Sequence, residues 1–406
     1  GVSDSIDLLR TSFSTDHTKF DAALDVLQVT TDTTTGIATI KNIITQQQMT
    51  SNITTRTYDG ALTDTTGVAT GITDIQAISA GFKAFSDLFS AGVPSDANAT
   101  LLGLFDSATF LQGGQNLAAF LSNITTDKTI VGVSFTNISV QSMDSANGKA
   151  FVKFSVLQNG KAVNDAPEAW YMIKKSGKWY MQGDQRIADV SIKPRAEYRP
   201  SDSFQPISTG LSINIEDRGG KGITSAVVTG KGLSNPVTLV NQINYGWFTI
   251  QGNNGGNLYN MNDAQIAAIA DSGEVYTVQL YGGTQLMATY TEKLRKRPYL
   301  NADLKPAGFP TITSPTLAVL RAFNGGSLTV TWTLPVGLTN DWLDMNINDN
   351  TGNSARAEYS LIPADTSKTI ILDAKTSVGQ TFTPTGRYIW LSVRDSFGRQ
   401  LSTSMW

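Results

Sequence analysis

The feature that most constrains this sequence is a hairpin across Glu168–Arg186, marked by two runs of aromatic and apolar residues. The runs flank Lys175-Ser-Gly-Lys178, in which Gly177 can supply the positive φ of a tight turn. Trp179 and Met181 share one face of the second run, because side chains alternate along a strand. One face of the hairpin can therefore be buried under helices.

Length and composition limit the number of domains and the kinds of functional site that the chain can form. The chain has 406 residues, more than one ordinary core accommodates, which predicts two to four domains. Only 16% of residues are charged and the net charge is −3, so no broad basic field exists to bind nucleic acid. Without Cys and with His17 as its one histidine, the sequence offers no thiolate or zinc site and no Ser-His or Cys-His machinery. We expect no metal, no cofactor and no catalytic residue.

The surface composition favours an exported protein. Thr, Ser, Asn and Gly occupy positions that Lys and Glu fill in many cytosolic proteins. No stretch approaches the roughly 20 apolar residues that span a bilayer. The sequence begins at Gly1 without an initiator Met, so we expect that a targeting segment has been removed. The expected location is the periplasm, an outer-membrane anchor or the cell surface.

Residues 1–58 are predicted to form a small helical and hairpin region. Apolar residues at helical spacing mark helices within Ile6–Phe13 and Phe20–Leu27, and Leu27–Ile40 predicts a hairpin. Residues 59–73 are rich in Gly, Thr and Asp and read as a linker.

The next region, 74–195, begins with helices. Asp74 is predicted to cap a helix that continues to Phe89, and shorter helices are expected near Asn98–Phe105 and Gln115–Ile124. Strands are then expected in the four runs Ile130–Met143, Lys149–Leu157, Ala169–Lys174 and Lys178–Val190.

Two segments of this region carry a family resemblance. They are Leu104-Phe-Asp-Ser-Ala-Thr-Phe-Leu-Gln-Gly-Gly-Gln-Asn-Leu-Ala-Ala-Phe-Leu121 and Ser176-Gly-Lys-Trp-Tyr-Met181. With the order of elements, they resemble the NTF2-like (SnoaL-type) α+β cone over about 74–195. That resemblance implies helices packed against a curved sheet. It does not indicate a function, because this fold hosts enzymes, binding proteins and scaffolds.

Beyond a second predicted linker at 196–210, the sequence contains two β-rich segments that look like copies. Three pairs of runs correspond: Leu211–Asp217 with Leu328–Leu334, Ile223–Gly230 with Trp342–Asp349, and Tyr276–Gly283 with Tyr388–Asp395. Short runs in which apolar and polar residues alternate, separated by frequent turns, predict immunoglobulin-like sandwiches at 196–298 and 299–406. The second resembles fibronectin type III domains, with Trp332 placed between its sheets.

The candidate binding residues are aromatic side chains of the region that resembles a cone. They could line an apolar cavity for a small ligand, or they could simply fill the core. They are Phe82, Phe85, Trp170, Tyr171, Trp179 and Tyr180.

Carboxylates and a basic stretch give two weaker hypotheses. Glu168, Asp184, Asp87 and Asp106 could act as acids or bases inside a cone, as in a lyase or isomerase, but none matches a family catalytic motif. The basic stretch Lys293–Arg297 is expected to be a solvated linker face.

The sequence thus favours three domains and a small N-terminal region: an NTF2-like α+β cone and two all-β immunoglobulin-like sandwiches. The leading hypothesis is a non-enzymatic surface or periplasmic protein with a binding or structural role, a lipoprotein if a lipidated Cys lies upstream. Its partner would be a small apolar ligand, or a protein or glycan of the cell surface. The alternatives are an enzyme with a cone carboxylate and a scaffold whose cone is packed shut. Pairing of two chains through the open sheet face is a further hypothesis.

Overall fold

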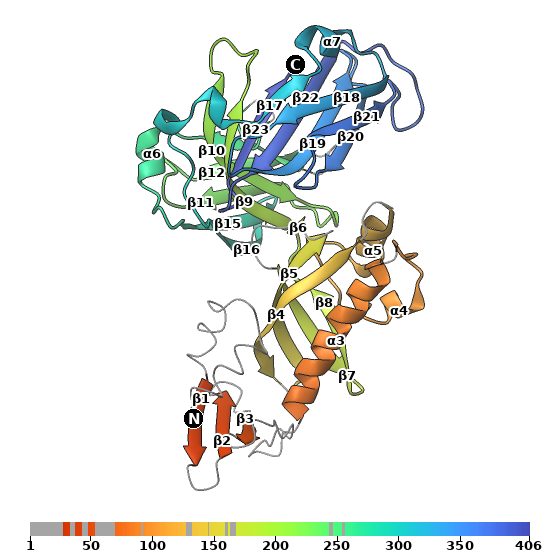
Figure 1. Ribbon diagram of the computed structural model, residues 1–406, viewed down its shortest axis with the longest axis vertical. Helices are drawn as coiled ribbons and strands as arrows, with labels where there is room; N and C mark the ends of the chain where they lie inside the picture. The colour runs from red at the N-terminus through yellow and green to blue at the C-terminus, as the bar shows by residue number, and fades with distance from the viewer. Residues whose placement is uncertain are drawn as a thin grey trace. The chain divides into compact units, whose positions relative to one another are not determined.

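The computed structural model describes residues 27–32, 37–42, 48–52, 70–90, 92–126, 132–144, 146–158, 161–162, 168–242, 247–253 and 256–406 (Figure 1). The helices predicted within residues 1–26 lie outside this range. The chain divides into two compact units. Unit 1 comprises Gly1–Phe110 and Phe120–Gln185, and unit 2 comprises Leu111–Ala119 and Arg186–Trp406.

A three-stranded antiparallel sheet opens unit 1. Its strands are β1 (Leu27–Asp32), β2 (Ile37–Asn42) and β3 (Gln48–Asn52), in that order. β1 and β2 form the predicted hairpin, with Leu27 opposite Asn42 and Asp32 opposite Ile37.

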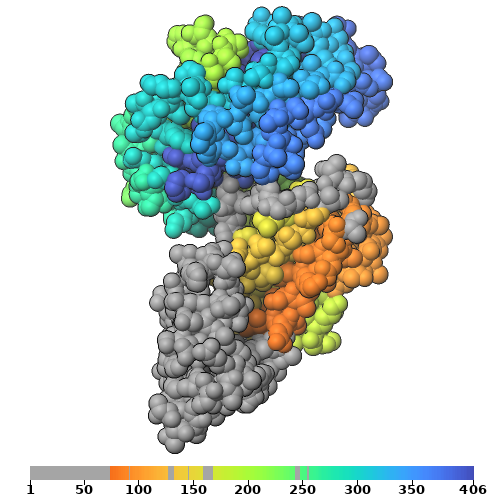
Figure 2. All heavy atoms as spheres, viewed as in Figure 1, coloured from red at the N-terminus to blue at the C-terminus, as the bar shows by residue number. Residues whose placement is uncertain are grey.

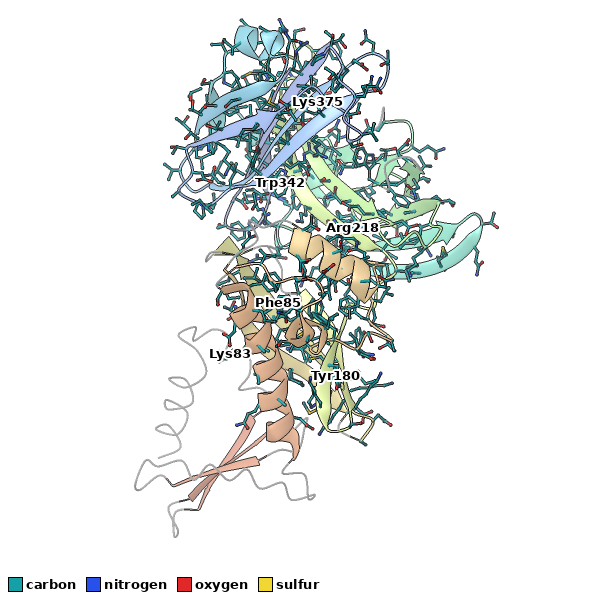
Figure 3. The ribbon with its side chains drawn as sticks, turned by 90° about the vertical axis from the view of Figure 1, so that its right-hand side faces the viewer. Lys83, Phe85, Tyr180, Arg218, Trp342 and Lys375 are labelled. Atoms are coloured by element: carbon teal, nitrogen blue, oxygen red, sulfur yellow. The ribbon has the colours of Figure 1, made fainter. Side chains whose placement is uncertain are left out.

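The helices of this part of the chain are α3 (Thr70–Ser90), α4 (Ala99–Leu102) and α5 (Leu117–Thr126). The side of α3 that carries Phe82 and Phe85 is buried, whereas Lys83 is exposed and pairs with Asp87 one turn later. Figure 3 shows Phe85 on the inner side of α3 and Lys83 on its outer side.

α3 corrects two predictions. It begins at Thr70, so residues 70–73 form its first turn instead of the end of a linker. Asp74 therefore lies inside the helix and is not its N-cap. Its buried carboxylate accepts hydrogen bonds from Lys174 Nζ (2.6 Å) and Trp179 Nε1 (2.9 Å). The residue ties α3 to the β7–β8 hairpin.

The main sheet of unit 1 is antiparallel and has the order β4-β5-β7-β8, with β6 beside β5. The strands are β4 (Val133–Asp144), β5 (Lys149–Gln158), β6 (Lys161–Ala162), β7 (Glu168–Lys175) and β8 (Lys178–Gly183). The predicted β7–β8 hairpin is confirmed, and Gly177 has a φ of 79° in its turn. The run predicted across Lys178–Val190 is wrong as one strand, because β8 ends at Gly183. Helices packed on one antiparallel sheet make this an α+β architecture.

The first sandwich of unit 2 has two layers, β9-β10-β14 and β16-β15-β11-β12-β13. Its elements are β9 (Asp189–Tyr198), β10 (Ile207–Glu216), β11 (Ser225–Thr229), β12 (Val237–Gln242), β13 (Trp247–Ile250), β14 (Leu258–Asn260), α6 (Asp263–Ala267), β15 (Val275–Gly282) and β16 (Gln285–Lys293). The layers join where Glu216 pairs with Trp247. Ile213, Leu239 and Val278 are among the buried residues between them.

The second sandwich has the layers β17-β18-β21 and β20-β19-β22-β23. Between the sandwiches lie the short helices η1 (Asn301–Asp303) and η2 (Pro306–Gly308). The second sandwich contains β17 (Thr311–Ser314), α7 (Leu317–Ala322), β18 (Gly326–Thr333), β19 (Thr339–Asn348), β20 (Ser354–Ser360), β21 (Ser367–Leu372), β22 (Gly386–Arg394) and β23 (Gln400–Met405). Trp332 is buried in the core, as predicted, and its indole N–H donates to Asn340 Oδ1 (2.9 Å).

The two sandwiches repeat one strand order, as the paired sequence runs predict. β10 and β18 each lie beside the first strand of their own sandwich. β11 and β19 each lie between the strand that follows and a later strand, β15 or β22. This order of two antiparallel layers is that of immunoglobulin-like domains. The prediction of two tandem immunoglobulin-like sandwiches is confirmed at this level.

The segment predicted as linker 196–210 includes the end of one strand and the start of the next. β9 continues to Tyr198 and β10 begins at Ile207, and they pair in register as a hairpin. Only the turn between them remains, where Asp202 Oδ1 accepts hydrogen bonds from the backbone N–H groups of Phe204 and Gln205. Pro200 and Pro206 lie in the loop that joins the two strands of this hairpin, so the segment is not a linker between domains.

Two glycines allow a close backbone approach within unit 2. A Cβ on Gly114 would lie 2.3 Å from the carbonyl oxygen of Ile187, and one on Gly219 would lie 1.9 Å from that of Gly114. The N–H of Gly114 donates to the carbonyl of Arg186 (2.7 Å). This packing holds the start of the first sandwich against the Leu111–Ala119 segment, which belongs to the same unit.

We expect Gly114→Ala to be more destabilising than Gly220→Ala. Both glycines have positive φ, so both substitutions strain the backbone by about 1 kcal/mol. Gly220 has open space around it, whereas Gly114 meets a backbone oxygen, which adds about 1–3 kcal/mol of overpacking. Urea denaturation of the two variants measures the difference, and equal losses would contradict the close approach.

Candidate functional site

The two sandwiches share one sheet, because the last strand of the second pairs with the first strand of the first. β23 lies parallel to β9, with Gln400 opposite Arg195 and Thr403 opposite Tyr198. β23 also pairs antiparallel with β22, so it lies between strands of both sandwiches. The result is one twelve-stranded sheet that runs from β16 to β20.

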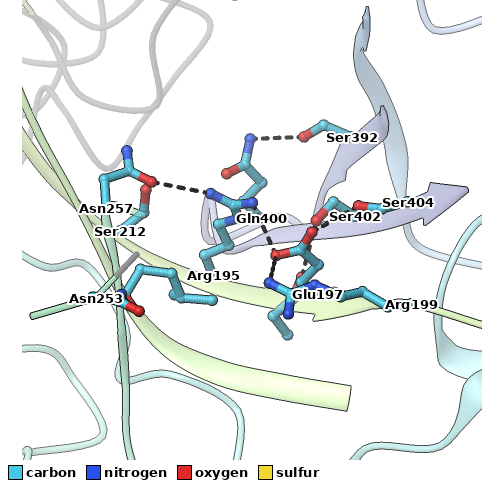
Figure 4. Close-up of polar contacts among 12 residues, drawn as sticks. Arg195, Glu197, Arg199, Ser212, Asn253, Asn257, Ser392, Gln400, Ser402 and Ser404 are labelled. Carbon is cyan, nitrogen blue, oxygen red and sulfur yellow. Dashed lines mark hydrogen bonds and ion pairs between the residues drawn. The ribbon is translucent and has the colours of Figure 1, made fainter. Parts of the chain in front are cut away.

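A buried carboxylate stands at this junction. Glu197 of β9 is 5% exposed. Its Oε2 accepts hydrogen bonds from Arg195 (3.1 Å) and Arg199 (2.9 Å), and its Oε1 accepts one from Ser404 Oγ of β23 (2.7 Å) (Figure 4). One carboxylate thus joins two cations of the first sandwich to a hydroxyl of the second.

Alternation along the strands places these groups together. Val190, Ile192 and Ala196 of β9 are buried in apolar clusters, so Arg195 and Glu197 face the other way. The same alternation turns three serines of β22 and β23 towards the junction: Ser392, Ser402 and Ser404, all fully buried. Because serine side chains are small, β22 and β23 leave room for the ion pairs on this face of the shared sheet.

Aromatic rings cover the two arginines. The guanidinium of Arg195 lies 5.2 Å from the ring centre of Trp390, and that of Arg199 lies 6.0 Å from that of Trp406. Both rings belong to the second sandwich, so the cation–π contacts cross the junction. They add attraction between the sandwiches, at a more buried place for Arg195 than for Arg199, whose side chain and partner ring Trp406 are partly exposed.

Glu197 remains ionised despite its burial. Desolvation acts to raise the pKa of Glu197, but the charge of Arg195 and the hydrogen bonds from Arg199 and Ser404 outweigh it and lower the pKa below its ordinary value. Burial, followed by the charge of Glu197, raises the pKa of Tyr388 on β22. The junction is therefore built around a fixed negative charge.

An apolar cluster lies behind the polar junction. Its buried members come from both sandwiches and from the segment between them: Ala196, Leu304, Phe309, Val393 and Leu401. Ala196 and Leu401 are opposite each other in the β9–β23 pairing. The junction thus has a core on one side of the sheet and an ion-pair network on the other.

A second brace fixes the segment between the sandwiches. Asp395 accepts hydrogen bonds from Tyr299 (2.7 Å) and Arg399 (2.7 Å), and Arg399 stacks on Tyr299 at 3.6 Å. Burial acts to raise the pKa of Asp395, but these two partners lower it overall. The backbone carbonyl of Tyr299 accepts from Thr209 of the first sandwich.

The basic stretch Lys293–Arg297 contributes to this brace. Lys296 and Arg297 contact Asp271 at 2.5 and 3.5 Å, and Lys296 also lies 4.9 Å from the ring centre of Phe397. Figure 2 shows dark-blue atoms of the β22–β23 end of the chain set among the teal atoms of the first sandwich. Instead of a purely solvated face, this stretch makes contacts across the junction.

The six predicted aromatic residues divide between two faces of the unit 1 sheet. Phe82, Phe85 and Trp170 are buried together, with Phe82 and Trp170 at 6.2 Å between ring centres. Trp179 is buried beside Asp74. Tyr171 is exposed on the opposite face, and Lys178 lies over the half-buried Tyr180.

Further rings, which the sequence analysis did not single out, complete the cluster around Trp170. They are Phe89, Phe105, Phe110, Phe120, Phe135 and Phe154. The indole N–H of Trp170 is buried there without an acceptor among the described residues.

The candidate carboxylates make ordinary contacts. Asp87 pairs with Lys83 on the surface. Asp106 is buried, and although burial acts to raise its pKa, Lys175 and Thr109 lower it below its ordinary value. Glu168 lies at the start of β7, and Asp184 follows the end of β8. The arrangement around Asp106 favours a permanent charge over proton transfer.

No cluster of His, Asp and Glu side chains in the described ranges could hold a metal ion. None of the described helices combines the length and apolar character needed to cross a membrane.

Comparison with known proteins finds similarity only among solved structures. No protein-family model and no curated protein matches the sequence. The chicken interferon gamma receptor alpha chain matches at 11% identity, covering 54% of this chain and 96% of its own, with a TM-score of 0.17. A tetra-tandem repeat of a large adhesion protein matches at 14%, covering 67% and 74%, with a TM-score of 0.16. The FN1-FN3 domains of chicken CNTN1 match at 12%, covering 67% and 98%, with a TM-score of 0.18.

These scores are too low to establish a shared fold. The assignment of unit 2 therefore rests on its own strand order and cores.

Sequence reasoning missed the junction. The predicted boundary between residues 195 and 196 falls inside β9. The available signal was the alternation of Lys193, Arg195, Glu197 and Arg199, which is a strand pattern with charges on one face. Their partner Ser404 lies more than 200 residues away, and sequence alone gives no sign of that contact.

Acid should weaken the junction through Glu197. Because its pKa is lowered in the folded chain, its stabilisation is complete above the ordinary glutamate pKa, about 4.3, and is lost as the pH falls through the folded value. Glu197→Gln lacks this titration. We expect the wild type to exceed the variant in unfolding free energy at pH 7, with a gap that narrows below about pH 4. Denaturant titrations across this range measure the gap, and a gap independent of pH would contradict the ionised junction.

Proposed function

We propose that this chain is a non-enzymatic exported protein of the cell surface or periplasm, in which the two sandwiches form one rigid element. The observation that carries the proposal is the β9–β23 pairing, which turns two domains into one continuous sheet. Tandem domains in one chain ordinarily move relative to each other unless their interface is large and apolar. Here a sheet, a shared apolar cluster and buried ion pairs oppose such motion.

A structural or binding role suits this construction. A rigid pair of sandwiches can act as a spacer. It would hold a binding surface on the sandwiches at a fixed distance and angle from a partner bound by the rest of the chain. The low charge and the surface rich in Thr, Ser, Asn and Gly support an exported location. A protein or glycan of the cell surface is the proposed partner class, and a lipid anchor upstream is part of the same hypothesis.

Spin-label distances test the rigidity directly. The chain has no Cys, so introduced cysteines are the only attachment sites. Thr291→Cys in β16 and Ser354→Cys in β20 label exposed positions on strands at opposite ends of the shared sheet. We expect one narrow distance distribution in the full chain. A broad or multimodal distribution would show that the sandwiches move independently.

A pair of substitutions separates the junction from general stability. Glu197→Ala leaves Arg195 and Arg199 without their shared partner, at a cost of about 2 kcal/mol because Arg199 is partly exposed to water. We expect this variant to broaden the distribution. Asp87→Ala removes an exposed ion pair with Lys83 and serves as the control, with no change expected.

A second candidate function concerns unit 1. The buried indole N–H of Trp170, which lacks an acceptor among the described residues, favours a small apolar ligand that carries one hydrogen-bond acceptor. Phe82 and Phe85 pack in the same cluster and would contact it, as the NTF2-like hypothesis implies. The rival within this unit is a scaffold whose rings fill the core.

Trp170→Phe distinguishes the ligand site from a filled core. The variant keeps a ring but removes the donor, so we expect it to lose a ligand that copurifies with the wild type. Native mass spectrometry of the full chain, isolated from its own host, compares the intact mass with the polypeptide mass. A bare polypeptide mass for the wild type, with Trp170→Phe equally or more stable, would favour the filled core.

A further inference from the structure

The sheet of unit 1 has a second face, opposite the one that the helices cover. Phe154 of β5 and Trp170 of β7 pack against Phe82 of α3, with ring centres 4.8 and 6.2 Å away, and Met181 of β8 is buried. Side chains alternate along a strand, so the intervening residues of each strand point to the other face. We call six of them the aromatic face: Lys149, Phe151, Lys153, Tyr171, Ile173 and Tyr180.

A pair of rings lies at the centre of the aromatic face. Phe151 is opposite Tyr171 in the β5–β7 register, and their ring centres are 4.9 Å apart. Tyr171 is 45% exposed. Ile173 is opposite Tyr180 on the next strand and extends the apolar surface towards β8. Rings held by a cross-strand contact lose little freedom when a partner stacks on them, so the pair is a preformed surface for another ring.

Two exposed lysines flank the rings along β5. Lys149 and Lys153 are each two residues from Phe151, which places their backbone positions about 13 Å apart along the strand. The residues opposite Lys153 on the two neighbouring strands are Ser139 and Ala169, neither of which is charged. The face therefore presents positive charge to solvent, in a chain whose net charge is −3.

The carboxylate beside this face does not cancel its charge. Asp144 is opposite Lys149, but its two oxygens accept hydrogen bonds from the backbone and the side chain of Asn147. On the β8 side, Lys178 lies 5.0 Å from the ring centre of Tyr180 and adds a third cation at the edge of the face. Charge complementarity therefore favours an anionic partner.

Two other occupants fit the aromatic face less well. In a symmetric pair of chains the same patch meets itself, so Lys149 and Lys153 would face like charges. A single strand of nucleic acid could stack its bases on the rings, but it carries one phosphate per nucleotide and binds through a basic groove that follows its backbone. Two lysines separated by a ring do not form such a groove.

A sugar polymer with acidic groups matches both parts of the face. The C–H groups on one side of a pyranose ring form a flat apolar surface that packs against aromatic rings. Carboxylate or sulfate groups on the neighbouring sugars would then reach the lysines on either side. We propose that the aromatic face binds an acidic glycan that lies along β5. The inference rests on the proposed binding role of this chain and names its partner class.

Surface plasmon resonance of the full chain tests this proposal on three immobilised polysaccharides. Hyaluronate supplies carboxylates, heparin supplies sulfates as well, and dextran is uncharged. We expect the wild type to bind at least one of the two acidic glycans and not to bind dextran. The affinity should fall as the salt concentration is raised, because salt screens exposed charges.

Matched variants locate the binding on the aromatic face. Tyr171→Ala removes the exposed ring and Lys153→Glu reverses one flanking charge, and each should weaken binding to the acidic glycan at least severalfold. Phe204→Ala removes a ring that is 96% exposed in unit 2, and Lys305→Glu makes the same charge reversal at an exposed lysine of that unit. We expect both controls to bind like the wild type. Circular dichroism melting establishes that all four variants are folded.

Several results would overturn the proposal. They are no response on either acidic glycan, an equal response on dextran, and a response that Tyr171→Ala and Lys153→Glu leave unchanged. Tighter binding to a single-stranded DNA oligonucleotide, or a dimer in light scattering that Tyr171→Ala dissociates, would assign the face to one of the two other occupants. The spin labels that test the rigid pair of sandwiches are in unit 2, so the two proposals can fail separately.

Discussion

The organisation of unit 2 depends on one buried carboxylate and the strand pairing around it. Removing a carboxylate from water is costly, and Glu197 is tolerated because two guanidinium groups and a serine hydroxyl satisfy it. The two guanidinium groups come from β9 and the residue that follows it, and the hydroxyl comes from β23, so all three partners are present only when both strands are in register. A buried ion pair adds little net stability over an apolar alternative, but it penalises every other register. Its contribution is to specify how the sandwiches join.

The two sandwiches use the same strand order with different surroundings. In the second sandwich, the last strand β23 pairs with β22 on one side and with β9 of the first sandwich on the other. In the first, the corresponding last strand, β16, stands at a free end of the shared sheet. The apolar cluster of Leu304 and Phe309 fills the space where the chain passes between them. Among the described strands, one repeated architecture thus gives a joined pair because β23 pairs with the other sandwich, whereas β16 does not.

Sequence patterns predicted the parts of the structure that depend on local order. The β7–β8 hairpin followed from Gly177 between two apolar runs, and the paired runs of the β-rich half predicted two equivalent sandwiches with Trp332 in a core. The predictions failed where residues far away in the sequence determine the local structure. Asp74 looked like a helix cap, but Lys174 and Trp179 bury it inside α3. Arg195, Glu197 and Arg199 looked like the end of a domain and the start of a linker, because nothing in their own neighbourhood reveals β23.

Hydrogen exchange of the full chain at β9 and β23 tests the shared sheet most directly. Amides in a sheet exchange slowly only while their strand stays paired, and cooperative units open together. If the sandwiches are one body, the β9 and β23 amides that bond each other are as well protected as those of β22 and are lost in the same opening event. If β23 exchanges independently of β9, or β9 exchanges as fast as the free edge β20, the sandwiches are separate domains and the account of the junction is wrong.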